Sequence, residues 1–262
     1  MDEQTPRSAL ITGSTSGIGE AAAVAFARAG FAVVVNGRDQ ARADAAAGRV
    51  AEASGSTHLR AVAADVATAE GAQTLIDAFG EIDVLVNNAG VFEPTPVLEI
   101  SDEEWLGYFE VNVLSGIRLA RHYLPGMVRR GWGRVIFVSS DSALLIPTEM
   151  VHYGVTKTAQ LAVARGLAQE VKGTGVTVNT VLPGPTLTLG VRDFIAARVG
   201  ADVPFEEAER RFIAEERPTS LLGRLIRPEE VANLIAYVGS EAASATTGAA
   251  LRADGGVVPT IP

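Results

Sequence analysis

A glycine-rich turn near the N-terminus places the strongest constraint on the fold of this chain. Residues 8–12 (SALIT) form a short apolar run, and a helical pattern follows from about residue 20 to residue 29. The turn between them contains Gly13, Gly17 and Gly19. Gly13 permits a tight turn, Gly17 lets a pyrophosphate approach the backbone, and Gly19 lets helix and strand pack closely, while free amides at the helix N-terminus attract phosphates. The order of strand, turn and helix therefore predicts a dinucleotide site, with the spacing Thr-Gly-x-x-x-Gly-x-Gly rather than Gly-x-Gly-x-x-Gly.

The end of the second apolar run bears on the choice of dinucleotide. Residues 31–36 are typical of a buried strand, and in such folds its end meets the adenosine ribose. An acidic side chain there would bind the 2′-hydroxyl of NAD, but this chain has Gly37 followed by Arg38. Because a guanidinium suits a phosphate, Arg38 favours NADP(H), with NAD(H) as the other possibility. In the alternative interpretation Arg38 is simply solvated and Asp39 caps the next helix.

Further apolar runs alternate with helical patterns along the rest of the chain. They cover residues 59–64, 82–86, 134–138, 176–181 and 249–252. This alternation is typical of a parallel α/β sheet. No internal repeat or interdomain linker interrupts it, so we predict one domain over residues 1–262. Many charges and three phenylalanines mark a segment at about 186–227, which predicts two short amphipathic helices that pass over the site as a substrate lid.

Composition limits the classes of protein and partner. Of the 262 residues, 47% are hydrophobic and 20% are charged, so a large core is possible. The formal net charge of −9 argues against nucleic acid or an anionic membrane surface as the main partner. Cysteine is absent, which excludes disulfides and thiolate chemistry, and the sequence shows neither a signal peptide nor an apolar run long enough to span a bilayer. We expect a cytoplasmic protein with no membrane or nucleic-acid partner and no metal.

The segment from Tyr153 to Lys157 is the strongest candidate for acid–base chemistry. Residues four apart lie on the same face of a helix, so the two side chains are expected to project together. A phenol normally keeps its proton until about pH 10. A nearby ammonium favours the phenolate and should lower the pKa of Tyr153 towards the working range. Ser140 follows the run at 134–138, at the edge where open α/β sheets place their ligands.

Two polar residues each allow two interpretations. Asp65 follows the third apolar run, where it could accept a hydrogen bond from the adenine amino group or act as the N-cap of the next helix. Asn112 lies within an apolar stretch of a predicted helix, and a buried amide must find partners. Those partners are either a neighbouring strand in the core or a water that relays protons.

Together these residues resemble the classical short-chain dehydrogenase/reductase family, and the match covers essentially the whole chain. The motifs that carry it are Thr12–Gly19, Asp65-Val66, the Asn-Asn-Ala-Gly turn at Asn87–Gly90, and Pro183-Gly184 with Thr188. The resemblance implies an α/β fold with a Rossmann-type doubly wound parallel seven-stranded sheet in the order 3-2-1-4-5-6-7 and helices on both faces. It also implies a homotetramer or homodimer.

The resemblance further implies a site, residue by residue. The catalytic tetrad would be Asn112, Ser140, Tyr153 and Lys157. The cofactor would bind Gly13, Thr15, Ser16, Gly17, Ile18, Gly19, Arg38, Asp65, Val66, Asn88, Ala89, Gly90, Tyr153, Lys157, Pro183, Gly184, Thr186 and Thr188. We expect the walls of the substrate pocket to include Ser142, Leu144, Leu145, Met150 and Pro185. The family often has glycine three residues after the catalytic serine, but here Ala143 occupies that place and Ser142 is a rival donor to Ser140.

The implied reaction is hydride transfer between a nicotinamide cofactor and a small-molecule carbonyl or alcohol. Tyr153 would exchange a proton with the substrate oxygen, Lys157 would hold the nicotinamide ribose, and Ser140 would bind the substrate oxygen. The leading hypothesis is an NADPH-dependent ketone or 3-oxoacyl reductase, and the alternative is an NAD-linked dehydrogenase of a sugar, polyol or cyclic alcohol. A third hypothesis, a non-catalytic cofactor-binding regulator, is disfavoured because such members usually lose the tyrosine or the lysine.

Overall fold

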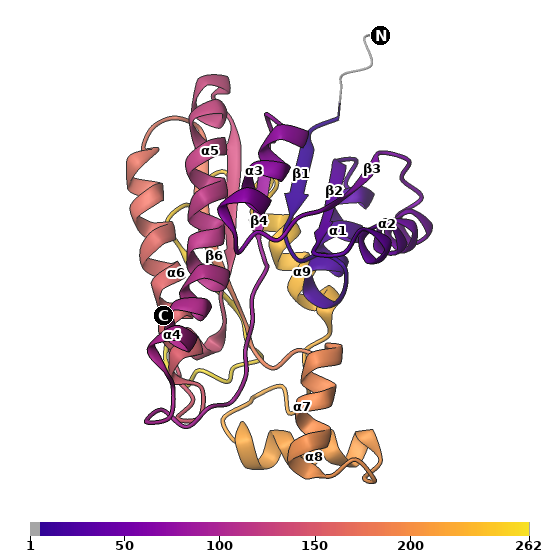
Figure 1. Ribbon diagram of the computed structural model, residues 1–262, viewed down its shortest axis with the longest axis vertical. Coiled ribbons are helices and arrows are strands. Elements are labelled where there is room, and N and C mark those ends of the chain that lie inside the picture. Colours follow the sequence, from indigo (N-terminus) through magenta and orange to yellow (C-terminus); the bar gives the residue numbers. More distant parts are fainter. Residues whose placement is uncertain (1–5, 262) are drawn as a thin grey trace.

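A parallel sheet of seven strands organises residues 6–261, the part of the chain that the computed structural model describes (Figure 1). The strands lie in the order β3-β2-β1-β4-β5-β6-β7, and every neighbouring pair is parallel. Their bounds are β1 Ser8–Ile11, β2 Ala32–Gly37, β3 Leu59–Ala63, β4 Val84–Asn87, β5 Gly133–Val138, β6 Val176–Pro183 and β7 Ala250–Ala253. The predicted fold class and strand order are confirmed, with strand ends shifted by one or two residues, as is usual for element boundaries.

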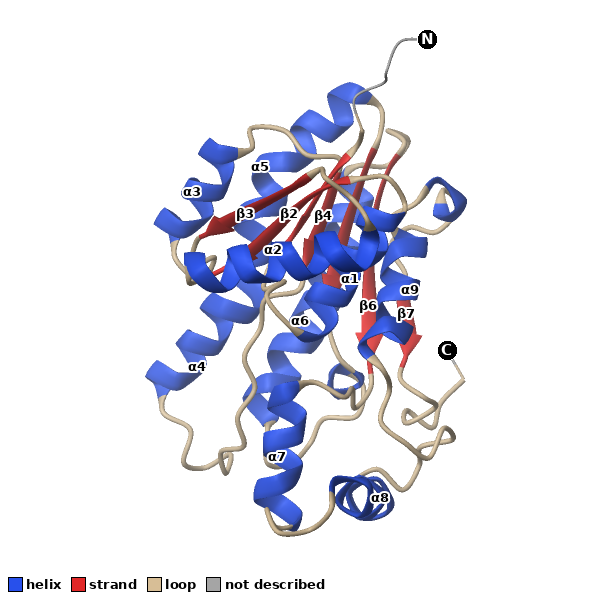
Figure 2. Ribbon diagram, turned by 90° about the vertical axis from the view of Figure 1, so that its right-hand side faces the viewer, coloured by secondary structure: helices blue, strands red, loops and turns tan. Residues whose placement is uncertain are grey.

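Helices cover both faces of the sheet, as Figure 2 shows. One layer contains α1 (Gly17–Arg28), α2 (Gln40–Ser54) and α9 (Pro228–Val238), and the other contains α3 (Ala69–Ala78), α5 (Ser115–Arg130) and α6 (Val151–Glu170). The central strands are apolar on both faces because each face packs against one of these layers. Leu10 on β1 lies between Val34 on β2 and Leu85 on β4, and all three are buried. Within residues 6–261, no helix has the length and apolar character needed to cross a membrane.

The helix predicted around Asn112 is interrupted by a π-helical turn. Helix α4 (Asp102–Phe109) begins at Ser101, whose side chain accepts a hydrogen bond from the amide of Glu104 at 3.1 Å. The π-helix Glu110–Leu114 follows, and the amide of Ser115 donates to the carbonyl of Glu110, five residues earlier. Such turns are uncommon and occur often at functional sites. This one faces α6, the helix that carries Tyr153 and Lys157.

The segment at 186–227 leaves the sheet after β6 and returns at a short bridge. Thr186 pairs with Ile226 there, and the amide of Leu187 donates to the carbonyl of Ile226 at 2.8 Å. Two helices lie between these ends, α7 (Leu189–Val199) and α8 (Phe205–Glu216). They extend beyond the carboxyl ends of the strands (Figures 1 and 2). Their own small core includes Phe194 and Phe212, whose rings meet edge-to-face at 5.9 Å.

Candidate active site

The glycine turn between β1 and α1 is held by the Asn-Asn-Ala-Gly turn after β4. The hydroxyl of Thr12 accepts hydrogen bonds from the amides of Asn88 and Ala89, each at 3.0 Å. In return, the side-chain amide of Asn88 donates to the carbonyls of Thr12 at 2.9 Å and Gly13 at 3.0 Å. A Cβ atom at position 19 would lie only 2.5 Å from the Asn88 side-chain nitrogen, so glycine is required there. The two motifs therefore form one rigid unit.

The N-terminus of α1 can accept an anionic group. Ser16 is the N-cap residue, but its side chain makes no capping hydrogen bond. Residues 16–19, at the start of α1, line a cavity that also contains Tyr153 and Lys157. A helix N-terminus carries free amides and a positive dipole, which suit a pyrophosphate. Gly13 and Gly17 adopt positive φ angles of 60° and 57°, the left-handed conformation that glycine accepts without strain. The turn therefore fits a dinucleotide.

A first cavity, of about 340 Å³, lies between the ends of β2, β3 and β4 and is called here the adenosine cavity. It is lined by residues predicted to bind the cofactor: Gly13, Thr15, Ser16, Arg38, Asp65, Val66, Asn88, Ala89 and Gly90. Arg42, on the first turn of α2, also lines it and was missed by sequence reasoning. Asp39 caps α2 by accepting a hydrogen bond from the Arg42 amide at 2.8 Å. Two arginines, Arg38 and Arg42, thus line this cavity.

The capping interpretation of Asp65 is wrong. Helix α3 begins after Thr68, whose hydroxyl accepts a hydrogen bond from the Gly71 amide at 2.9 Å. The carboxylate of Asp65 instead accepts from the amide of Ala67 at 3.1 Å. The helix starts three residues later than an Asp65 cap would require. Asp65 remains exposed in the adenosine cavity, where its other carboxylate oxygen can accept a further hydrogen bond.

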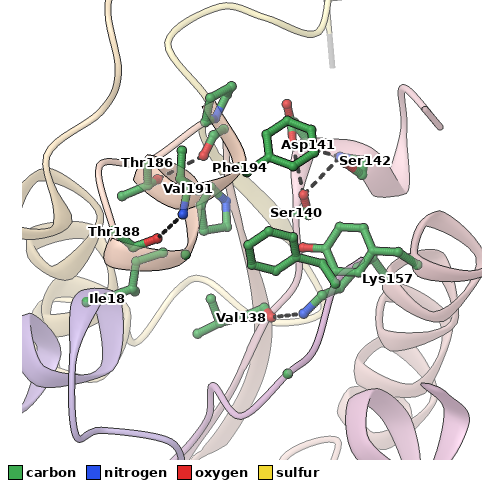
Figure 3. Close-up of a pocket in the computed structure, with 18 of the residues that line it drawn as sticks. Ile18, Val138, Ser140, Asp141, Ser142, Lys157, Thr186, Thr188, Val191 and Phe194 are labelled. Carbon is green, nitrogen blue, oxygen red and sulfur yellow. Dashed lines mark hydrogen bonds between the residues drawn. The ribbon is translucent and has the colours of Figure 1, made fainter. Parts of the chain in front are cut away.

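A second cavity, of about 350 Å³, lies at the carboxyl ends of β5 and β6 and is called here the catalytic cavity (Figure 3). Most predicted residues converge on it: Ser16–Gly19, Asn88, Gly90, Ser140, Ser142, Met150, Tyr153, Lys157, Pro183–Thr186 and Thr188. Two expected wall residues do not, because Leu144 and Leu145 are 50% and 44% exposed and lie outside its lining. Sequence reasoning missed Phe92, which reaches the cavity from the loop after Gly90.

Ser140 and Ser142 contribute different groups to the catalytic cavity. The Ser140 hydroxyl donates to the Asp141 carboxylate at 2.8 Å and accepts from the Ser142 amide at 3.1 Å. Ser142 contacts its two neighbours through its backbone amide rather than its hydroxyl, because this amide also donates to the Asp141 carboxylate at 2.9 Å. Asp141 is only 6% exposed, and burial raises the pKa of its carboxyl, which the Ser140 hydrogen bond and the charge of Arg217 partly oppose. Ser140 is the better placed hydroxyl.

Tyr153 and Lys157 lie on one face of α6, as their spacing predicts. The Lys157 ammonium donates to the carbonyl of Val138 at 3.0 Å and lies 5.5 Å from the centroid of the Tyr153 ring (Figure 3). Burial lowers the pKa of Lys157 to about 8. Exclusion of bulk water raises the pKa of Tyr153 above its ordinary value, and a hydrogen bond to Ser140 opposes this only in part. The expected lowering of the Tyr153 pKa is therefore wrong for this structure, because desolvation raises this pKa and the opposing group is Ser140 rather than the Lys157 ammonium.

Asn112 is buried behind the catalytic cavity rather than in it. Its side-chain amide donates to the carbonyl of Val91 at 3.1 Å and to the hydroxyl of Thr156 at 3.0 Å, and it accepts from the Val91 amide at 2.8 Å. These bonds tie the loop after β4 to the helix that carries Lys157. Both Asn112 and Lys157 pack closely against Gly90. A Cβ atom at position 90 would lie 3.3 Å from the side-chain oxygen of Asn112 and 3.4 Å from the ammonium nitrogen of Lys157. The core interpretation of this amide fits these contacts.

Comparisons with known proteins agree with this geometry. A family model described as enoyl-(acyl carrier protein) reductase, one of the short-chain dehydrogenase/reductase models, matches residues 13–258. The chain belongs to the short-chain dehydrogenase/reductase family. It is 46% identical over 256 residues to the uncharacterized oxidoreductase YvaG of Bacillus subtilis, covering 97% of each chain. It is 34% identical over 257 residues to a D-beta-hydroxybutyrate dehydrogenase of Cupriavidus necator, covering 96% of this chain and 98% of that one.

A solved structure of another family member supports the same assignment. The L-sorbose reductase of Gluconobacter frateurii, solved with NADPH and L-sorbose, superimposes with a TM-score of 0.91 at 34% identity and covers 98% of both chains. As a member of the short-chain dehydrogenase/reductase family, this protein is an NAD(P)-dependent oxidoreductase, and the named relatives act on small molecules. Among residues 6–261 there is no group of three side chains able to hold a metal ion.

Proposed function

We propose that this protein is an NADPH-dependent ketone reductase that uses Tyr153 as its proton donor. The observation that carries this proposal is the convergence of Tyr153, Ser140 and Lys157 on one cavity that also receives the N-terminus of α1. The bound nicotinamide would supply the hydride. The protein would then supply the proton, the orientation of the ketone and the exclusion of water.

The protonation states of the three side chains suit reduction. The phenol of Tyr153 is protonated at neutral pH, as phenols ordinarily are, and burial raises its pKa further, so it can give a proton to the alkoxide as it develops. The Ser140 hydroxyl lies beside Tyr153 and would hold the substrate oxygen. An ammonium has three N–H donors, and the carbonyl of Val138 takes one from Lys157. The other two would bind the nicotinamide ribose hydroxyls, while Asn112 fixes the helix that carries Lys157.

The adenosine cavity favours a 2′-phosphate over a free ribose. Arg38 and Arg42 both line it, and arginine binds phosphate in a forked geometry. Asp39 also lines this cavity, but its carboxylate caps α2 by accepting from the Arg42 amide. This bond engages only one oxygen of the carboxylate, so the preference for a 2′-phosphate depends on Arg38 and Arg42. These contacts favour a reductase with NADPH over the alternative, an NAD-linked dehydrogenase of a sugar, polyol or cyclic alcohol.

The proposal is tested with a panel of ketones, including 3-oxoacyl thioesters, and the matching alcohols, each assayed with both cofactors. We expect ketone reduction with NADPH. Tyr153→Phe should lower kcat by about 100- to 10,000-fold, because only the hydroxyl is removed. Binding of NADPH, measured by its fluorescence, should change little in this variant. Near-normal turnover by Tyr153→Phe, or no turnover of any ketone or alcohol by the natural protein, would contradict the proposed function.

A further inference from the structure

The charged side chains that line the catalytic cavity differ in the hydrogen bonds and ion pairs that they form. Among the described residues that line it, three are charged: Asp141, Lys157 and Arg217. Lys157 donates to the carbonyl of Val138, and Asp141 is bound by the Ser140 hydroxyl and the Ser142 amide. Both belong to the end of the cavity where Tyr153 lies. Arg217 comes from a different part of the chain, the 186–227 segment, where it directly follows helix α8.

Arg217 lines the catalytic cavity and makes few contacts of its own among residues 6–261. Arg198 and Arg211, on the same segment, each form an ion pair with a glutamate of that segment, and Arg224 pairs with Glu230 on α9. Of the ion pairs formed within residues 6–261, none includes Arg217. Its guanidinium donates one hydrogen bond, at 2.7 Å, to the backbone carbonyl of Glu216 and lies 5.7 Å from the centroid of the Phe212 ring. A guanidinium has five N–H donors, so most of them are available.

The walls around Arg217 add to the attraction for an anion. Apolar side chains of Phe92, Met150, Phe194 and Phe212 line the cavity with it. A charge beside such walls is only partly hydrated, and an opposite charge on a ligand is therefore attracted more strongly than in open water. Arg217 also lowers the pKa of Asp141, though less than burial raises it, so its positive charge is felt at the Ser140 end. The cavity thus combines the reacting groups of Ser140 and Tyr153, apolar walls and a guanidinium.

We propose that Arg217 binds a carboxylate on the substrate, so that the enzyme reduces oxo acids with a short hydrocarbon body to hydroxy acids. The carbonyl would lie at Ser140 and Tyr153, and the carboxylate would lie against the guanidinium of Arg217. This inference rests on the proposed ketone reductase activity and adds the substrate class. Arg217 would act on affinity and orientation, and the proton and hydride steps would not involve it.

The test compares each oxo acid with its own methyl ester, which keeps the carbonyl and removes the charge. Aliphatic oxo acids of increasing chain length are assayed with NADPH, using the natural protein and the variants Arg217→Gln and Arg192→Gln. Arg192 is the matched control, because it lies exposed on α7 over the Phe205 ring, forms no ion pair within residues 6–261 and does not line the catalytic cavity. We expect Arg217→Gln to lower kcat/KM for the preferred acid by about 10- to 100-fold, mainly through KM, as charge-assisted hydrogen bonds are lost.

The expected pattern is specific to the charge. The ester should be reduced at nearly the same rate by the natural protein and by Arg217→Gln, and Arg192→Gln should resemble the natural protein for both substrates. An equal loss for acid and ester in Arg217→Gln would overturn the inference. If that equal loss also occurred in Asp141→Asn, it would point to a contact between Arg217 and Asp141 that closes the cavity. Reduction of esters but not acids by the natural protein would overturn the substrate class and leave the ketone reductase activity standing.

Discussion

Replacing Lys157 by methionine should make the protein more stable and catalytically inactive at the same time. Lys157 is 4% exposed, and burial lowers its pKa from 10.5 to about 8. The folded state therefore disfavours the charged ammonium relative to the unfolded chain. A difference of this size corresponds to a cost of about 3 kcal/mol, at about 1.4 kcal/mol per pKa unit. Methionine has a similar length and carries no charge, so Lys157→Met removes this cost but also loses the bond to Val138, which is worth about 1 kcal/mol.

The sign of the effect depends on pH. Below pH 8 Lys157 is protonated in both states, and the full cost is present. Between pH 8 and 10.5 the folded protein releases this proton before the unfolded chain does, so the contribution of Lys157 to stability improves as pH rises. We therefore expect Lys157→Met to raise the free energy of unfolding by about 2 kcal/mol at pH 7. The gain should shrink towards pH 10.

Two measurements check this reasoning. Urea denaturation of the natural protein and of Lys157→Met at several pH values gives the difference in unfolding free energy, and exposed Lys172→Met is the matched control, expected to stay within about 0.5 kcal/mol. Lys157 and Lys172 are the only lysines in the sequence, so side-chain NMR resolves Lys157 without further mutation. The Lys157 signal should titrate near pH 8. Titration near 10.5, or no gain in stability at pH 7, would refute the burial argument.

The remaining predictions concern the cofactor and the rival serines. Arg38→Asp should lower kcat/KM with NADPH relative to NADH by about 10- to 100-fold, because a cation facing the adenosine cavity becomes an anion. An unchanged ratio in steady-state assays with both cofactors would remove Arg38 from the 2′-phosphate site. Ser140→Ala should lower kcat by about 100-fold, as expected for the loss of a donor to the reacting oxygen. Ser142→Ala should remain near normal because Ser142 bonds its neighbours through its backbone amide, and the opposite order of losses would exchange the roles of the two serines.

Some features of the site were predictable because they depend on short stretches of sequence. Gly13 lies between β1 and α1, and Gly17 and Gly19 lie in the first turn of α1, so the order of strand, glycine turn and helix alone indicates a dinucleotide turn. The four-residue spacing of Tyr153 and Lys157 places them on one helical face wherever the helix lies. The carboxyl end of β5 brings Ser140 to the same edge of the sheet. Each of these inferences needs only the local backbone geometry and the parallel order of the strands.

Other features depended on surroundings that no local pattern contains. The pKa of Tyr153 is set by how completely its neighbours exclude water, and these neighbours come from several distant segments. Leu144 and Leu145 follow Ser140 closely, yet the chain turns at Asp141–Ala143 and carries them to the surface. The sequence allows Asn112 to be a water ligand or a core amide, and only the tertiary structure supplies its contacts with Val91 and Thr156.

The sequence by itself determined the class of fold, the dinucleotide turn and the acid–base pair, since periodicity and glycine placement act over a few residues. Only the tertiary structure decided which charges are engaged. Arg38 and Arg42 both line the adenosine cavity, and Arg217 lines the catalytic cavity together with Asp141 and Lys157, although these residues come from different elements of the fold. Burial and electrostatic interaction depend on distance in space, and that distance is fixed only when the strands, helices and the 186–227 segment have packed together.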